Sequence, residues 1–207
     1  MSSIGSAPTP FNSLAYWKNR YAKGQNSGSG SYGQVADFKA KALNGFIHEH
    51  AISTCVEFGS GDGNQLGMLE IASYLGFDVA PDAVKLCIEK FRGDSTKSFM
   101  LYDPKYFVNN SFIEAELTLS MDVILHLIED DIYSEYMSAL FGASTKYVAI
   151  FTTATDEQPA KMASHNKFRD HRPWVRVHAP NFREVSAALT PLELGYPAGT
   201  GFYFYSN

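Results

Sequence analysis

The feature that most constrains the fold is a glycine-rich segment that directly follows a short apolar run. Residues 53–58 read Ser-Thr-Cys-Val-Glu-Phe, and Gly59, Gly61 and Gly63 follow at alternate positions. Because glycine has no Cβ atom, a glycine-rich backbone can turn tightly and approach a ligand closely. Open α/β sheets bind their ligands at the carboxyl ends of the strands. The segment therefore predicts a ligand site at the end of a first buried strand.

Apolar segments alternate with helical patterns along most of the chain. After a helix over 34–50, we expect strands at 53–58, 74–78, 98–102, 116–121 and 147–152, with a helix or helical turn at 64–71 and helices at 81–91 and 130–141. Such alternation is typical of an α/β fold with a parallel sheet covered on both faces. Two closing elements are expected at 181–189 and 201–205, the second as an edge strand.

The length of 207 residues fits one domain with a small cap. Residues 1–33 are interpreted as an N-terminal tail, a capping helix at 11–21 and a Gly/Ser loop at 22–33. Residues 34–207 are interpreted as a single domain. The first ten residues, rich in Ser, Pro and Gly, are expected to be loose.

Composition narrows the range of partners. A net charge of −5 argues against a general nucleic-acid binder, so a small-molecule partner is expected. No apolar run approaches the ~18 residues of a membrane span. The N-terminus lacks the features of a signal peptide, which makes a cytoplasmic location the expectation. The sequence leaves monomer and homodimer open.

The glycine loop favours a nucleoside without phosphates over a dinucleotide. A dinucleotide fingerprint would place its third glycine at position 64, which is Asn64. Asp62 adds a negative charge that would repel pyrophosphate but not a sulfonium or ammonium group. Asp78 follows Glu57 by 21 residues, at the end of the second expected strand. A carboxylate in that position can accept hydrogen bonds from both ribose hydroxyls.

Glu57-x-Gly59-x-Gly61-x-Gly63 resembles motif I of the class I S-adenosylmethionine (SAM)-dependent methyltransferases, and Asp78 matches their ribose-binding acid. The resemblance covers about residues 16–205. It implies a Rossmann-like three-layer sandwich with a seven-stranded, mostly parallel sheet of order 3-2-1-4-5-7-6 and an N-terminal helical cap. It also implies SAM as cofactor, bound by Glu57, the three glycines and Asp78.

Looser likenesses suggest further cofactor contacts. Asp103 follows the third expected strand, where family members often hold the adenine. Residues 16–21 resemble the N-terminal helix that covers the cofactor in many members. By that likeness Tyr16, Tyr21 or Tyr32 closes over the methionine end through a cation–π contact with the sulfonium. Ordinary packing of a capping helix is the alternative.

Residues 119–130 resemble the family's motif IV region, which faces both cofactor and acceptor. Within it Asp122 and His126 are the first candidates for catalysis. Histidine titrates near neutral pH and can act as a base towards a hydroxyl acceptor. A structural histidine in the following turn is the alternative, and Asp122 can also cap the next element.

A second polar cluster spans residues 165–174. We interpret His165, Arg169 and Arg172 as substrate-binding and His171 as catalytic, because arginine suits carboxylate and phosphate recognition. A solvated polar loop is the alternative. No metal is expected, since the acids near Asp122 (Glu129, Asp130 and Asp131) are better explained as helix N-terminal residues.

These features together favour a methyltransferase that acts on a small polar acceptor through oxygen. A saccharide or sugar-linked metabolite of polysaccharide or natural-product biosynthesis is the preferred interpretation. N-methylation of a small amine or peptide is the alternative of the same class. An NAD-dependent oxidoreductase and a non-catalytic nucleoside-binding module are the alternatives from other classes.

Overall fold

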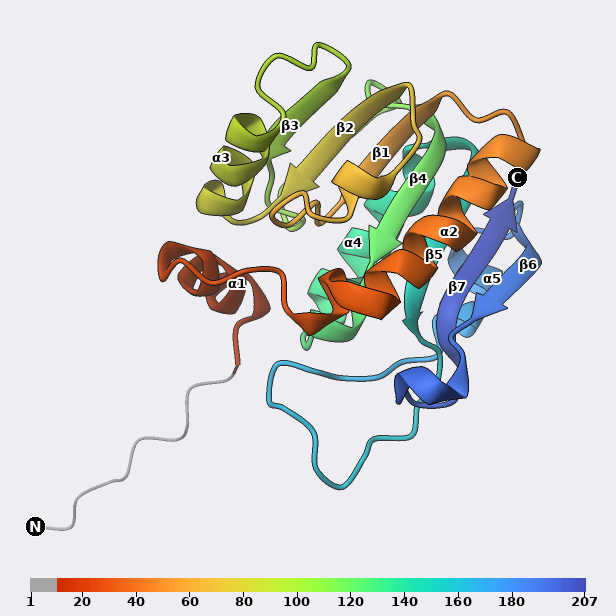
Figure 1. Cartoon of the computed structure of the whole chain (residues 1–207). Coiled ribbons are helices and arrows are strands. Elements are labelled where there is room, and N and C mark those ends of the chain that lie inside the picture. The colour runs from red at the N-terminus through yellow and green to blue at the C-terminus, as the bar shows by residue number, and fades with distance from the viewer. Residues whose placement is uncertain (1–10) are drawn as a thin grey trace, which may run out of the picture.

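The computed structural model describes residues 11–207, so the expected loose tail at 1–10 lies outside the described residues. Seven strands form one sheet in the order β3-β2-β1-β4-β5-β7-β6 (Figure 1). The pairs that include β7 are antiparallel and the others are parallel. The strand order predicted from the resemblance is thereby confirmed. The strands are β1 Thr54–Phe58, β2 Ser73–Asp78, β3 Lys97–Leu101, β4 Ala115–Met121, β5 Ser144–Thr153, β6 Arg183–Leu189 and β7 Thr200–Ser206.

Helices cover both faces of this sheet, with α2 on one side and α4 and α5 on the other (Figure 1). None of the helices within residues 11–207 is long and apolar enough to cross a membrane. The helices are α1 Ser13–Ala22, α2 Gly33–Glu49, α3 Pro81–Lys90, α4 Asp130–Gly142 and α5 Arg172–His178, and short 3-10 turns lie at Ser29–Ser31, Leu66–Met68, Ile124–His126 and Leu192–Leu194.

The helical turn expected at 64–71 is reduced to the 3-10 turn Leu66–Met68. Gly67 lies in the middle of this segment, and glycine disfavours a helix interior by about 1 kcal/mol relative to alanine. After the glycine loop, the chain therefore reaches β2 mainly through irregular backbone.

Alternation along the strands decides which side chains face which helix. In β1, Val56 and Phe58 join the buried cluster that contains α4, and Cys55 joins the cluster that contains α2. Successive strand residues point to opposite faces. Glu57 therefore lies on the face covered by α2, together with Lys39 of that helix.

The expectation that residues 201–205 form an edge strand is wrong. β7 pairs with β5 on one side and with β6 on the other. Its residues from Phe202 to Tyr205 are all buried, on both faces of the sheet. A strand that is apolar on both faces is typical of the interior of a covered sheet. The edge strand at this end of the sheet is β6, most of whose residues are exposed.

The core under α4 generates a prediction about stability. Leu140 is fully buried in that cluster, so Leu140→Ala should lower the free energy of unfolding by about 2–5 kcal/mol, the cost of a buried cavity. The control is Leu192→Ala, at a leucine that is 83% exposed, which should change it by less than about 0.5 kcal/mol. Urea denaturation checks both values, and equal effects would contradict the packing described here.

Candidate active site

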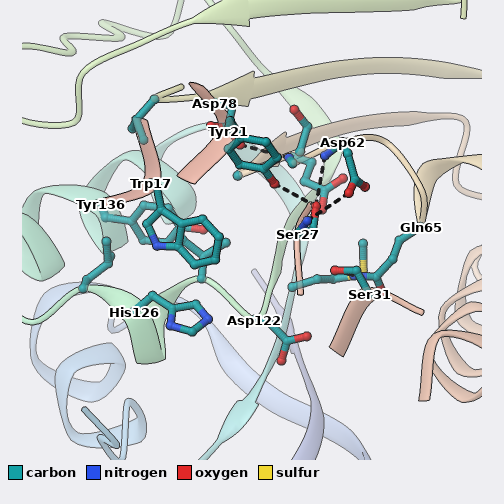
Figure 2. Close-up of a pocket in the computed structure, with 18 of the residues that line it drawn as sticks. Trp17, Tyr21, Ser27, Ser31, Asp62, Gln65, Asp78, Asp122, His126 and Tyr136 are labelled. Carbon is teal, nitrogen blue, oxygen red and sulfur yellow. Dashed lines mark hydrogen bonds between the residues drawn. The ribbon is translucent and has the colours of Figure 1, made fainter. Parts of the chain in front are cut away.

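A cavity lies at the carboxyl ends of β1, β2 and β4 (Figure 2). It encloses about 780 Å³ when its open mouth is included. The parts of the chain that surround it include α1 and the segment after it (Trp17, Tyr21, Ser27), the loop after β1 (Gly59, Gly61, Asp62), the end of β2 (Asp78), the segment after β3 (Tyr102, Pro104) and the segment after β4 (Asp122, His126).

The loop after β1 has the conformation that its glycines predict. Gly59 and Gly61 both have left-handed φ angles, of 91° and 59°. A Cβ atom on Gly59 would lie 2.4 Å from the Val123 side chain, and one on Gly61 would lie 2.4 Å from Ser27 Oγ. Gly63 also has a positive φ, but it packs against Phe91 rather than lining the cavity. Two of the three glycines therefore belong to the cavity wall.

Asp78 is buried at the cavity wall and is held by backbone donors. Its carboxylate accepts hydrogen bonds from the N–H of Gly61 at 2.9 Å and of Ala80 at 2.8 Å. Burial raises the pKa of Asp78 to about 6, and these N–H groups oppose the shift. Each carboxylate oxygen has a second acceptor position, so the side chain is able to accept two hydroxyl groups of a ligand.

Glu57 lies deeper in the same wall and is shielded from water. It accepts a hydrogen bond from the Tyr74 hydroxyl. Burial raises the pKa of Glu57 to about 8, although Tyr74 and Lys39 both lower it. A ligand ammonium group beside this side chain would favour its charged form.

The Asp62 carboxylate forms hydrogen bonds with the segment between α1 and α2. Its Oδ2 accepts hydrogen bonds from the Ser27 N–H at 2.9 Å and from the Tyr32 hydroxyl at 2.7 Å. The Asp62 N–H in turn donates to Ser27 Oγ, which also contacts the Tyr21 hydroxyl (Figure 2). Burial alone would raise the pKa of Asp62, but these bonds hold it below its ordinary value. Tyr32, predicted at the cofactor, is thus bonded to Asp62 outside the cavity lining.

The aromatic residues of α1 that line the cavity are Trp17 and Tyr21, not Tyr16. Residues four positions apart lie on the same side of a helix, whereas neighbours differ by about 100°. Tyr16 therefore points elsewhere, and its ring stacks on His165 at 4.7 Å. The sequence marks the aromatic helix but not which of its faces is turned to the cavity.

Asp103 also lies outside the cavity lining. Its Oδ1 accepts a hydrogen bond from the Lys105 N–H at 3.1 Å, within the turn after β3. Its neighbours Tyr102 and Pro104 are the residues that line the cavity. The structure therefore brings the segment to the site but directs the carboxylate into the turn.

Asp122 lines the cavity in a left-handed conformation, with φ of 57°. Its carboxylate forms an ion pair with Lys39 of α2. Sequence reasoning missed this lysine. The available signal was its position: Val35, Lys39 and Leu43 are spaced by four residues, so the lysine falls on the buried stripe of α2.

His126 lines the cavity on the same side as Trp17 (Figure 2). Its Nδ1 lies 3.0 Å from the carbonyl oxygen of His165, which can only accept a hydrogen bond. The neutral ring therefore carries its proton on Nδ1, and Nε2 is the atom that can accept another. Burial lowers the pKa of His126, against the opposing effects of the His165 carbonyl and Asp122. The ring is accordingly suited to act as a base.

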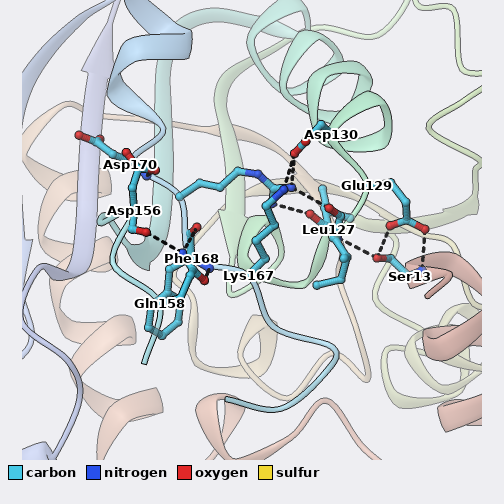
Figure 3. A network of polar contacts seen from close by, with 11 residues as sticks. Ser13, Leu127, Glu129, Asp130, Asp156, Gln158, Lys167, Phe168 and Asp170 are labelled. Atoms are coloured by element: carbon cyan, nitrogen blue, oxygen red, sulfur yellow. Dashed lines mark hydrogen bonds and ion pairs between the residues drawn. The ribbon is translucent and has the colours of Figure 1, made fainter. Parts of the chain in front are cut away.

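The cations of the 165–174 cluster are paired with acids. Lys167 Nζ and Arg169 Nη2 each lie 2.7 Å from Asp130 Oδ1 (Figure 3). Arg172 forms a two-pronged ion pair with Asp170, at 2.7 and 2.9 Å. Neither Arg169 nor Arg172, predicted to bind substrate, lines the cavity. His165 reaches the site only through its contacts with His126 and Tyr16.

The structure does not bring His171 to the cavity, contrary to the catalytic interpretation. Its side chain is fully buried between the start of α5 and β7, with Nε2 2.8 Å from the Tyr205 hydroxyl. The ring also packs edge-on against Tyr203 at 5.1 Å. Burial lowers its pKa to about 4. We therefore interpret His171 as a neutral core residue.

The acids around Asp122 are held separately. Glu129 accepts hydrogen bonds from the backbone N–H and the hydroxyl of Ser13, at the start of α1 (Figure 3). Asp130 pairs with Lys167, and Asp122 with Lys39. Within residues 11–207, no group of three or more His, Cys, Asp or Glu side chains is arranged to hold a metal ion.

Comparison with known proteins gives structural matches only. Neither a protein-family model nor a curated protein sequence matches the chain. Many solved structures resemble it, and three of them do so along nearly their whole length. Magnesium protoporphyrin IX methyltransferase from Synechocystis, with bound SAM, has a TM-score of 0.68 at 11% identity and covers 97% of this chain and 100% of its own.

The other two are also methyltransferases. The N-methyltransferase NodS from Bradyrhizobium japonicum, in complex with S-adenosylhomocysteine (SAH), has a TM-score of 0.68 at 13% identity, covering 95% of this chain and 99% of its own. A SAM-dependent methyltransferase from Clostridium acetobutylicum has a TM-score of 0.60 at 8% identity, with coverage of 93% and 96%. The chain has the fold of the class I SAM-dependent methyltransferases. At these identities the likeness establishes the fold and leaves the acceptor undetermined.

The buried His171 generates a prediction about pH. In the unfolded chain a histidine titrates near pH 6.5, but folding lowers the pKa of His171 to about 4. Between these values only the unfolded state binds the proton, so the folded state loses stability as the pH falls. From pH 6.5 to pH 5, the free energy of unfolding of the wild type should fall by about 1.5 kcal/mol relative to His171→Phe.

Urea denaturation at several pH values checks this difference. The matched control is Tyr205→Phe, which removes the same hydrogen bond but keeps the buried imidazole. It should therefore keep the acid sensitivity of the wild type. Parallel pH curves for the wild type and His171→Phe would show that the imidazole titrates equally in both states.

Proposed function

We propose that this protein is a SAM-dependent methyltransferase and that the cavity binds the cofactor and the acceptor side by side. The observation that carries the proposal is the position of Asp78 and the glycine loop in the same cavity as His126 and Asp122. The residues proposed to bind the nucleoside and the proposed base His126 therefore line the same cavity. The division into a cap at residues 1–33 and a domain at 34–207 belongs to the same proposal.

Each wall has a role in cofactor binding. Asp78 accepts the two ribose hydroxyls, and Glu57 lies beside the ammonium group of the methionine end. Gly59 and Gly61 let the cofactor approach the backbone. Trp17 and Tyr21 cover it from α1. Asp103, Tyr16 and Tyr32 lie outside the cavity lining, so we assign them no direct contact with the cofactor.

Bound SAM supplies a methyl group that is already activated by its sulfonium. The protein therefore needs mainly to place the acceptor atom in line with that methyl carbon. His126 Nε2 accepts the proton that an acceptor hydroxyl loses. Asp122, fixed by Lys39, orients the acceptor beside it.

For the acceptor we propose a small polar molecule methylated on oxygen, with a saccharide or sugar-linked metabolite as the first choice. Trp17 lines the cavity, and its ring lies 4.9 Å from the His126 ring, which supports a ring-shaped acceptor. The arginines of the 165–174 cluster give no support for an anionic one, because they are paired with Asp130 and Asp170. A neutral saccharide is accordingly preferred to an anionic one.

N-methylation of an amine is the second candidate, and the charge of the cavity favours it. Asp62, Asp78 and Asp122 all line the cavity, while its lining within the described part of the chain includes no lysine or arginine. Such a wall attracts a cationic molecule. The structurally similar methyltransferases act on different molecules, since one is named for magnesium protoporphyrin IX and another is an N-methyltransferase.

The first test is calorimetric titration of the purified protein with SAH, with NAD as control. We expect micromolar binding of SAH and no binding of NAD. Asp78→Ala should weaken SAH binding about a hundredfold, since it removes two hydrogen bonds to a charged group. Asp103→Ala, at the acid directed into its turn, is the matched control and should bind like the wild type. NAD binding without SAH binding would favour the oxidoreductase.

The second test separates catalysis from binding. SAM turnover is measured in an acceptor screen that begins with neutral sugars and sugar nucleotides and includes small amines. His126→Ala should lower kcat about 10²–10⁴-fold, the usual contribution of a general base, and leave SAH affinity unchanged. His178→Ala, on the exposed surface of α5, is the control. Turnover that survives His126→Ala would remove this residue from the mechanism, and SAH binding without any turnover would favour a non-catalytic module.

A further inference from the structure

Lys39 is a charged side chain in the interior of the protein. Its side chain is 1% exposed, in the middle of α2. Taking an ammonium group out of water is costly unless it is paired and hydrogen-bonded. An apolar residue of similar length would fill the same space without that cost. The lysine therefore requires an explanation beyond packing.

The ammonium group of Lys39 joins three separate parts of the chain. It pairs with the Asp122 carboxylate after β4. It donates a hydrogen bond to the Gly30 carbonyl at 2.7 Å, in the segment between α1 and α2. It also lies 4.4 Å from the centre of the Phe151 ring in β5. The cation is thus shared between the acceptor side of the cavity and the segment that covers it.

Gly30 packs directly on the same carboxylate. A Cβ atom at this position would lie 2.7 Å from Asp122 Oδ2, so only glycine allows the segment to approach this closely. The other side of the segment is held by Asp62 through Ser27 and Tyr32. Residues 27–32 are therefore attached at two acids, one on the glycine loop and one after β4.

We propose that Lys39 is a positioning residue that couples closure of residues 27–32 over the cavity to the placement of Asp122. When the segment is closed, one ammonium group satisfies both the Gly30 carbonyl and the carboxylate. When the segment lifts, Lys39 loses the carbonyl, and Asp122 loses the backbone packed against it. The consequence for methyl transfer rests on the proposed function, whereas the coupling itself does not.

Hydrogen exchange of the ligand-free protein tests the coupling without cofactor or acceptor. The amides of Ser31 and Tyr32 donate hydrogen bonds within the segment, at 3.0 and 3.2 Å. Lys39→Met keeps the length and removes the charge, and it should raise their exchange at least about tenfold while amides of β4 and β5 stay protected. Lys41→Met, at the exposed lysine two residues on, should exchange like the wild type.

Gly30→Ala is the second variant, because it keeps Lys39 and pushes the segment away from Asp122. It should raise exchange at the same amides. Unchanged exchange at Ser31 and Tyr32 in both variants would overturn the proposal. An equal increase in β4 and β5 would also overturn it, since Lys39 would then be a residue of general stability.

A double-mutant cycle tests the consequence for turnover. Lys39→Met and Asp122→Asn should each lower kcat at least about tenfold, and the double variant should be no slower than the slower single one. Effects that multiply would show that the two residues act independently. If the wild type turns over no acceptor, the proposed function fails in that assay, and the exchange experiment still decides whether Lys39 couples the segment to Asp122.

Discussion

The cavity depends on the way in which the end of β1 is fastened to the end of β2. The N–H groups of Gly59 and Ser60 both donate to the Phe77 carbonyl, at 2.7 and 2.9 Å, and the Gly61 N–H donates to Asp78. These bonds turn the chain sharply away from the sheet and leave the loop backbone facing the cavity. Because two of the donors are glycines with left-handed φ angles, other residues would strain the turn. The ligand-binding wall and the acid within it are thus produced by one set of backbone hydrogen bonds.

Around this wall, the charges of the site are distributed so that each acid has a defined structural partner. Asp62 holds the segment after α1, Asp78 holds the glycine loop and Asp122 holds Lys39. The same pattern applies outside the cavity, where Asp130 and Asp170 neutralise the cations of the 165–174 cluster. The acids of the site therefore also join parts of the structure. Residues 27–32 accordingly contact the loop after β1 and the segment after β4 through polar groups.

Sequence reasoning predicted those parts of the molecule that depend on local pattern. The strand order, the glycine loop and the acid at the end of β2 follow from alternation, spacing and resemblance. The rest depends on contacts between distant residues. The rotation of α1 about its axis decides that Trp17 rather than Tyr16 lines the cavity. The arginines of the 165–174 cluster are not available to a substrate, because they pair with Asp130 and Asp170. His171 looked available because nothing in its neighbours shows that β7 covers it. Lys39 was detectable only as a charge on a buried stripe.

One wall of the cavity is built from a piece of chain that precedes the sheet. Helix α1 is attached through Ser13, whose backbone and hydroxyl groups both bond to Glu129. It contributes no strand, and it packs through Trp17 and Tyr21 on Ala80 and Ala83 and through Leu14 on the core under α4. Substitutions in this helix can accordingly reshape one side of the cavity while the sheet and the glycine loop keep their geometry. Because this wall is separate from the sheet, the shape of the cavity can change during evolution while the scaffold that supports it is retained.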